Sequence, residues 1–116
     1  MLKKFFLAAI FGLIICAGGK VEAEEIFVGN APITDYKCYV LTDTIRRNYE
    51  DRMVITSATL KTVDRYGDED FIDYKFFALD GGTKDVLFTN SNGDKGSANS
   101  FDAPIEWAMY MIIRDY

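Results

Sequence analysis

The stretch that decides the fold is residues 104–113, which read PIEWAMYMII. Its apolar side chains recur three or four positions apart, as on one face of an amphipathic helix. The positions that share this face are Ile105, Ala108, Met109 and Ile112, and the stripe is widened by Trp107, Met111 and Ile113. Because an isolated helix of this length is only marginally stable in water, it must pack against another apolar surface.

The flanking residues indicate where this helix starts and ends. The Asp102 carboxylate can accept hydrogen bonds from the first N–H groups of a helix. Pro104 suits the first turn, Glu106 lies near the positive end of the helix dipole, and Arg114 lies near its negative end. We therefore predict a C-terminal helix that covers residues 105–113.

The apolar surface that this helix needs is offered by residues 71–79. Asp73 and Lys75 point to one side of an extended chain, while Ile72, Tyr74, Phe76 and Ala78 point to the other. This alternation is typical of a half-buried antiparallel strand.

Further strands are predicted before and after this one from β-branched and aromatic residues between turn signals. They cover residues 26–28, 36–42, 44–46, 52–63 and 85–89, with a turn at 47–51, a hairpin closed by residues 80–83, and a loop at 90–100. The predicted fold class is α+β: a single antiparallel sheet of about five or six strands in meander order, with one C-terminal helix packed on one face.

The first 23 residues have the layout of a secretory signal peptide. A basic start at Lys3 and Lys4 precedes an apolar run, and Ala23 closes a Val-x-Ala cleavage site before Glu24. The apolar run is shorter than the ~20 residues that cross a bilayer. We therefore expect a signal peptide over residues 1–23, a single α+β domain over 24–116 without a membrane span, and a location outside the cell or in the periplasm or cell envelope.

A lipid anchor on Cys16 is the alternative fate of this segment. A lipoprotein signal places a small residue directly before the modified cysteine, and bulky Ile15 stands there instead. The cleavage site after Ala23 is the better match.

The charge of the chain argues against nucleic acid as a partner. The net charge is −5, and removing residues 1–23 with their three lysines and Glu22 makes it −7. Nucleic acid and anionic lipid both favour a basic face, so neither is expected to bind.

Cys38 is the single cysteine of the expected mature chain. We interpret it as a small buried apolar residue, while an inter-chain disulfide and a reactive thiol remain open. The chain has no histidine to activate a thiol.

No catalytic, cofactor-binding or metal-binding residue is predicted. The absence of histidine excludes the usual Ser-His and Cys-His nucleophiles and Cys/His zinc sites. The run Asn90-x-Asn92-x-Asp94 resembles the start of a calcium loop, but Lys95 replaces the required glycine and Phe101 the required glutamate. The number of acidic residues does not exclude a pair of carboxylates that cleaves glycosides. However, so small a domain rarely forms the deep cleft that a sugar substrate needs. The expected protein is therefore not an enzyme.

Arg46, Arg47 and Arg52 form the only basic concentration in the acidic chain, and they are the candidate partner-contact patch. The alternative is that these charges keep a strand edge soluble and unpaired. An apolar patch beside the arginines would favour a binding module. A uniformly polar surface would favour a structural or stress-related envelope protein with no dedicated ligand.

Three stretches resemble the surface-adhesin protein E family of small exported bacterial proteins. Residues 36–47 are similar to its tyrosine-containing strand, residues 71–89 to its central hairpin, and residues 103–108 to the Pro-x-Glu opening of its last helix. The resemblance implies a twisted antiparallel sheet with a C-terminal helix, an envelope location, and binding to a surface or host protein. The chain departs from the family in lacking a second mature cysteine. An exported, non-enzymatic, adhesin-like binding domain of open oligomeric state is the resulting expectation.

Overall fold

The computed structural model describes residues 24–79 and 85–116. The predicted signal peptide and the residue before its cleavage site, Ala23, lie outside the described residues. The same holds for the turn predicted at 80–83.

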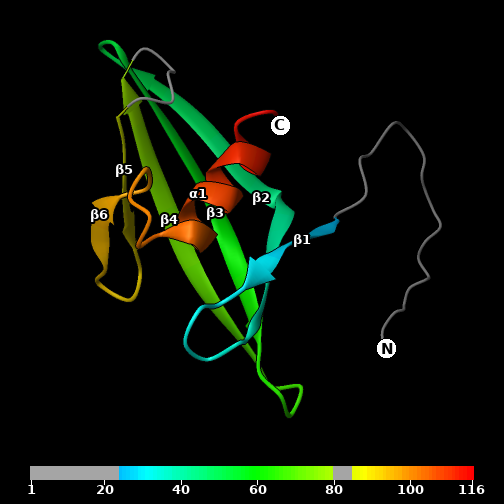
Figure 1. The fold of residues 1–116 in the computed structure, drawn as a ribbon. Coiled ribbons are helices and arrows are strands. Elements are labelled where there is room, and N and C mark those ends of the chain that lie inside the picture. The colour runs from blue at the N-terminus through cyan, green and yellow to red at the C-terminus, as the bar shows by residue number, and fades with distance from the viewer. Residues whose placement is uncertain (1–23, 80–84) are drawn as a thin grey trace, which may run out of the picture.

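A single antiparallel sheet forms one layer of the molecule, and one helix forms the other (Figure 1). Each strand pairs with the next one in the chain, which confirms the predicted meander. The elements are β1 (Glu25–Asn30), β2 (Lys37–Glu50), β3 (Met53–Val63), β4 (Glu69–Leu79), β5 (Val86–Asn90), β6 (Lys95–Ser97) and α1 (Pro104–Ile113).

The helix packs on one face of the sheet, which we call the covered face, and the core lies between the two layers. The helix side chains in this core are Ile105, Met109, Tyr110 and Ile113. The Tyr110 ring lies 5.5 Å from the ring of Phe76 on β4. The predicted alternation of β4 is confirmed, since Tyr74, Phe76 and Ala78 are buried together.

A buried polar contact also joins the two layers. The Tyr74 hydroxyl donates a hydrogen bond of 2.7 Å to Glu106 Oε2. Burial, and then this bond to a carboxylate, raise the pKa of Tyr74 well above its usual range, so the hydroxyl stays a donor.

The helix differs in two details from the prediction. Ala103 is the N-cap and no side chain caps the first turn, so Asp102 does not have the predicted role. The turn before the helix is closed instead by the Ser100 carbonyl, which accepts from the Ala103 N–H at 3.0 Å. Met111, predicted to widen the apolar stripe, is exposed, because the buried face passes through Tyr110 and Ile113.

The prediction of two short strands and a turn between residues 36 and 51 is wrong, because β2 runs without a break to Glu50. The pairing with β3 shifts between Leu41 and Arg46, which marks a bulge. Inside it the Thr44 hydroxyl donates to the Leu41 carbonyl at 2.6 Å and accepts from the Thr59 N–H at 2.8 Å. This side chain replaces the missing backbone pair, so the strand continues past Asp43.

The prediction of a loop over residues 90–100 is wrong in part, since β6 lies within it. Asn90 Oδ1 accepts hydrogen bonds from the N–H groups of Asn92 and Asp94. Gly93 adopts a φ of 89°, which favours glycine. This turn brings Lys95–Ser97 back to pair with β5.

Candidate functional site

The face of the sheet opposite α1 is the candidate site, and we call it the open face. No helix or strand among the described residues packs on it (Figure 1). Side chains at every second position of each strand line this face. Large apolar side chains on it are exposed, namely Phe27, Met53, Phe71, Leu79 and Leu87.

One end of the open face, which we call the apolar end, consists of Met53, Ile55, Phe77, Leu79 and Leu87. The strand register places Met53 beside Leu79, and Ile55, Phe77 and Leu87 side by side on β3, β4 and β5. Leu79 and Leu87 are more than half exposed. A contiguous apolar surface on three neighbouring strands is therefore open to solvent.

The other end of the open face carries an aromatic row. Phe27, Tyr39, Lys61 and Phe71 lie in register across β1, β2, β3 and β4. The rings of Phe27 and Tyr39 meet edge to face at 5.5 Å. Lys61 Nζ lies 5.3 Å from the centroid of the Tyr39 ring, a cation–π contact.

Lys61 is buried although it stands on the open face. Its Nζ lies 2.7 Å from Glu25 Oε1 and 3.5 Å from Glu69 Oε2. Burial alone lowers the pKa of Lys61, but the hydrogen bond and the charges of the two glutamates outweigh it and raise the pKa overall. Lys61 is therefore a fixed cation that joins β1, β3 and β4.

The structure separates the three predicted contact arginines. Arg47 lies on the covered side, where its Nη2 donates a 2.7 Å hydrogen bond to the Ile113 carbonyl at the end of the helix. Arg46, its neighbour, lies on the open face beside Ser57. Its Nη1 donates to the Asp43 and Ile45 carbonyls in the bulge, at 3.0 and 2.9 Å. Consecutive strand residues point to opposite faces, so the pair cannot form one patch.

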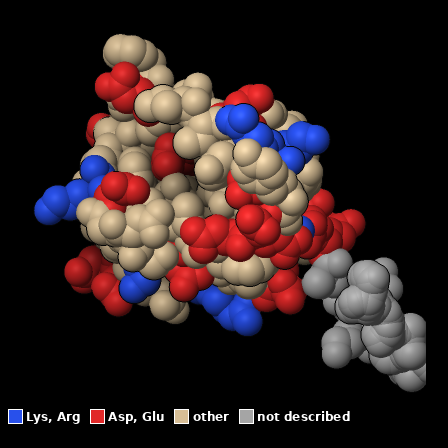
Figure 2. Space-filling view, turned by 90° about the horizontal axis from the view of Figure 1, so that it is seen from below, with Lys and Arg blue, Asp and Glu red and all other residues tan. Residues whose placement is uncertain are grey.

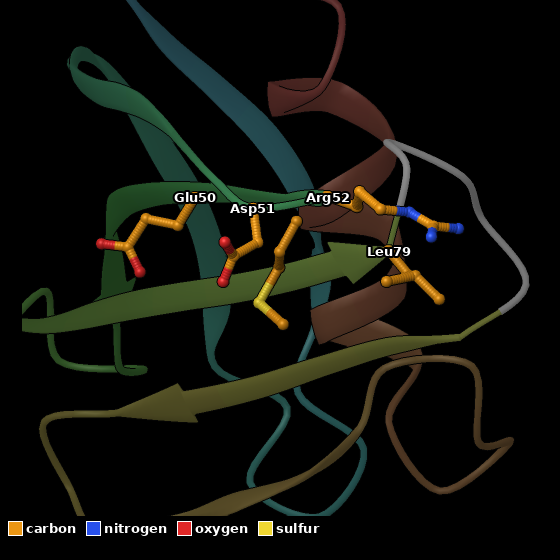
Figure 3. Close-up of a pocket in the computed structure, with 5 residues that line it drawn as sticks. Glu50, Asp51, Arg52 and Leu79 are labelled. Atoms are coloured by element: carbon orange, nitrogen blue, oxygen red, sulfur yellow. The ribbon is translucent and has the colours of Figure 1, made fainter.

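Arg52 lies at the tip of the β2–β3 hairpin, next to the apolar end. A shallow hollow there is lined by Glu50, Asp51, Arg52, Met53 and Leu79. Figure 3 shows the Arg52 side chain extending toward the side of Leu79, with the two carboxylates on the opposite side. The structure therefore places Arg46 and Arg52 on the side of the open face and Arg47 on the covered side.

Acidic side chains gather at the opposite end of the sheet. Asp64, Asp68, Glu69 and Asp70 lie in or next to the β3–β4 turn. Figure 2, which views the molecule from below, shows Asp and Glu side chains concentrated on that surface. Arg52, at the tip of the β2–β3 hairpin, and these acids therefore lie at opposite ends of the long strands.

Cys38 lies on the covered face with 2% of its surface exposed, which confirms the interpretation as a buried residue. Its Sγ donates to the Tyr36 carbonyl at 3.6 Å. Burial, and then the charge of Glu106, raise the pKa of the Cys38 thiol. The Cys38 thiol is therefore neither ionised nor accessible.

Residues 24–79 and 85–116 contain no group of three or more acidic or cysteine side chains arranged to hold a metal ion. Within the same residues, the helix is too short to cross a membrane.

The sequence pattern does not predict the open face, because it identifies only Asp73 and Lys75 on the outer side of β4. Phe71, Phe77 and Leu79 share that side. A strand with apolar residues on both sides is the signal that could have shown it.

Comparisons of the chain with models of protein families, with curated proteins and with solved structures give no match. The functional argument therefore depends on the fold and on the surface of the sheet.

Proposed function

We propose that the chain is an exported, non-enzymatic domain that binds another macromolecule through the open face, as an adhesin does. The observation that supports this proposal is the exposure of apolar side chains at both ends of one face of the sheet. Contiguous exposed apolar surface with a polar rim is characteristic of interaction sites.

The composition of the face supports protein as the partner. Aromatic, methionine and arginine side chains are enriched at protein interfaces. Here Phe27, Phe71 and Met53 supply the exposed apolar area, Arg52 stands beside the apolar end, and Arg46 lies near the centre of the face. A partner exposed at a cell or host surface fits the export expected from residues 1–23 and the resemblance to the adhesin family.

A structural or stress-related envelope protein without a dedicated ligand is the second candidate. The observation that favours it is the intramolecular use of Arg46 and Arg47, which bond to the bulge and to the helix end. Under this alternative the open face would have no specific partner.

Site-specific photo-crosslinking tests the proposal. A photoreactive phenylalanine analogue at Leu87, 56% exposed on the open face, should give discrete protein adducts in intact cells of the source organism. The same analogue at Met111, 37% exposed on the helix, is the matched control and should not. Leu79→Glu should abolish the Leu87 adducts by charging the apolar end. Equal labelling from both positions, or none from either, would favour the structural alternative.

A further inference from the structure

The geometry points to a second copy of this chain as the partner that the open face fits best. We infer a face-to-face dimer about a two-fold axis that lies between the two sheets and runs perpendicular to the strands. This inference rests on the proposed function, because it assigns a partner to the same face.

Such an axis reverses the strand direction, so each end of one open face lies over the opposite end of the other. With the axis over the paired residues Ala58 and Tyr74, the middle of β3 and β4 lies at the centre of the interface. At the level of the apolar end, Ile55 of each copy then lies over Lys61 of the other, and Leu79 lies over Glu69.

Strand β4 is self-complementary about this axis. Lys75 lies two residues from Asp73 on the same face, one on each side of the centre. Lys75 of one copy therefore lies over Asp73 of the second copy, and the symmetry repeats this ion pair. Farther out, Phe77 lies over Phe71 of the second copy.

Strand β2 is self-complementary as well. Lys37 at its start and Glu50 at its end lie on the open face, paired with Val63 and Met53 respectively. The reversed direction places Lys37 of one copy over Glu50 of the second copy. Arg46 comes to lie over Leu41 and close to Glu25, whose pairing with Leu41 places it on the adjacent strand.

A two-fold axis parallel to the strands and placed along β3 is less favourable. An axis along β3 would place Lys61 over its own copy and Lys75 over Arg46. Like charges in contact oppose association. The charge pattern therefore argues against an axis along β3, whereas the perpendicular axis brings opposite charges together.

The size of the face agrees with a dimer. The 11 residues of β3 span about 36 Å, and four strands span roughly 19 Å, so about 700 Å2 can be covered. A standard interface buries ~800 Å2 on each partner. We expect a dimer with a dissociation constant in the micromolar range, weakened by salt because charge pairs contribute.

A zero-length carbodiimide cross-link between Lys37 and Glu50 tests the geometry directly. The two residues stand at opposite ends of the 14-residue β2, roughly 40 Å apart within one chain. A Lys37–Glu50 cross-link can therefore form only between copies. Its presence in the purified full chain, and its loss at high salt, are the expected results.

Charge exchange provides the second test, with the dimer measured by sedimentation equilibrium. Asp73→Lys and Lys75→Asp should each raise the dissociation constant about tenfold or more. The double variant carries both changes and restores the opposite-charge contacts between copies, so it should recover the dimer. Asp102→Lys, on an exposed residue outside the open face, is the charge-matched control.

The melting temperatures show whether each variant is folded, which matters because Asp73 Oδ1 accepts a hydrogen bond from Thr59. A chain that stays monomeric up to about 1 mM would overturn the dimer. So would a dimer that neither single variant weakens. If the chain is monomeric but Leu87 still labels another protein, the proposed function stands and only the identity of the partner is wrong.

Discussion

The two faces of this sheet are built from the same strands, yet they differ in what their side chains do. On the covered face, Phe76 has no exposed surface and packs against Tyr74, Phe88 and Tyr110. On the open face, Phe71 of the same strand is 52% exposed. The comparison shows that one helix is enough to complete a core, which leaves the apolar side chains of the other face exposed.

Charge is also distributed differently on the two faces. On the covered side, Arg47 and Glu106 bond to the helix end and to Tyr74, so charge serves to attach the helix. On the open face, Asp73 and Lys75 of β4 carry opposite charges two residues apart. These two charges add little to the stability of one chain, but they can pair with opposite charges on a second surface.

The largest difference between the two faces is expected from a matched pair of substitutions on β4. Phe76→Ala removes a fully buried ring from the aromatic cluster and should lower the free energy of unfolding by about 3–5 kcal/mol. Phe71→Ala removes a ring from the open face and should cost about 1 kcal/mol or less. Urea unfolding of both variants measures the difference. Equal losses would mean that the open face contributes to the core as much as the covered face does.

Lys61 is the exception on the open face, and the second prediction concerns it. Lys61→Met removes the cation that lies between Glu25 and Glu69. The loss should be about 1–2 kcal/mol, because the bonds are charged but the two glutamates are half exposed. Lys95→Met, on an exposed lysine of the same face, is the control and should cost less than about 0.5 kcal/mol.

The pH dependence of the Lys61 contribution follows from the sign of its pKa shift. The pKa is raised in the folded chain, so the contribution is fully present below the unfolded pKa of about 10.4. It is lost as the pH rises through the folded pKa. The difference in stability between the native chain and Lys61→Met should therefore shrink above that range; a difference that grows with pH would contradict the proposed ion pairs.

The elements that the sequence predicted correctly are those with a strong local period. The alternation of residues 71–79 and the helical spacing from Ile105 to Ile113 are both local signals, and both elements form. The bulge in β2 has no such signal, because Thr44 replaces a backbone partner only once Thr59 lies beside it.

The candidate site was harder to predict for the same reason. The aromatic row is made by the pairing register of four strands, which joins Phe27 to Phe71 across 44 positions of the sequence. Register is a property of the assembled sheet, not of any one strand. The role of Arg47 depends on a carbonyl 66 residues away, so composition alone could not separate it from Arg46 and Arg52.

A smaller loss of stability is expected from a substitution of Arg47, where the covered face meets the end of the helix. Arg47→Gln shortens the side chain that donates to the Ile113 carbonyl, and it removes a cation from the negative end of the helix dipole. The expected loss is about 0.5–1 kcal/mol, measured by thermal unfolding. Arg52→Gln, at the hairpin tip, is the control. A larger loss from Arg52 than from Arg47 would show that the helix end does not depend on this contact.

The smallest expected effect is that of Cys38 on dimer formation, because this residue lies on the covered face. Cys38 lies beneath the helix, and its neighbour Tyr39 stands on the open face. Cys38→Ser keeps a donor for the Tyr36 carbonyl, so the monomer–dimer ratio should not change. The folded chain should also resist thiol reagents until it unfolds, because burial raises the pKa of this thiol and closes access to it. A ratio that falls with Cys38→Ser, or that responds to reductant, would instead assign the dimer to an inter-chain disulfide, and the charge pattern of the open face would then have no part in it.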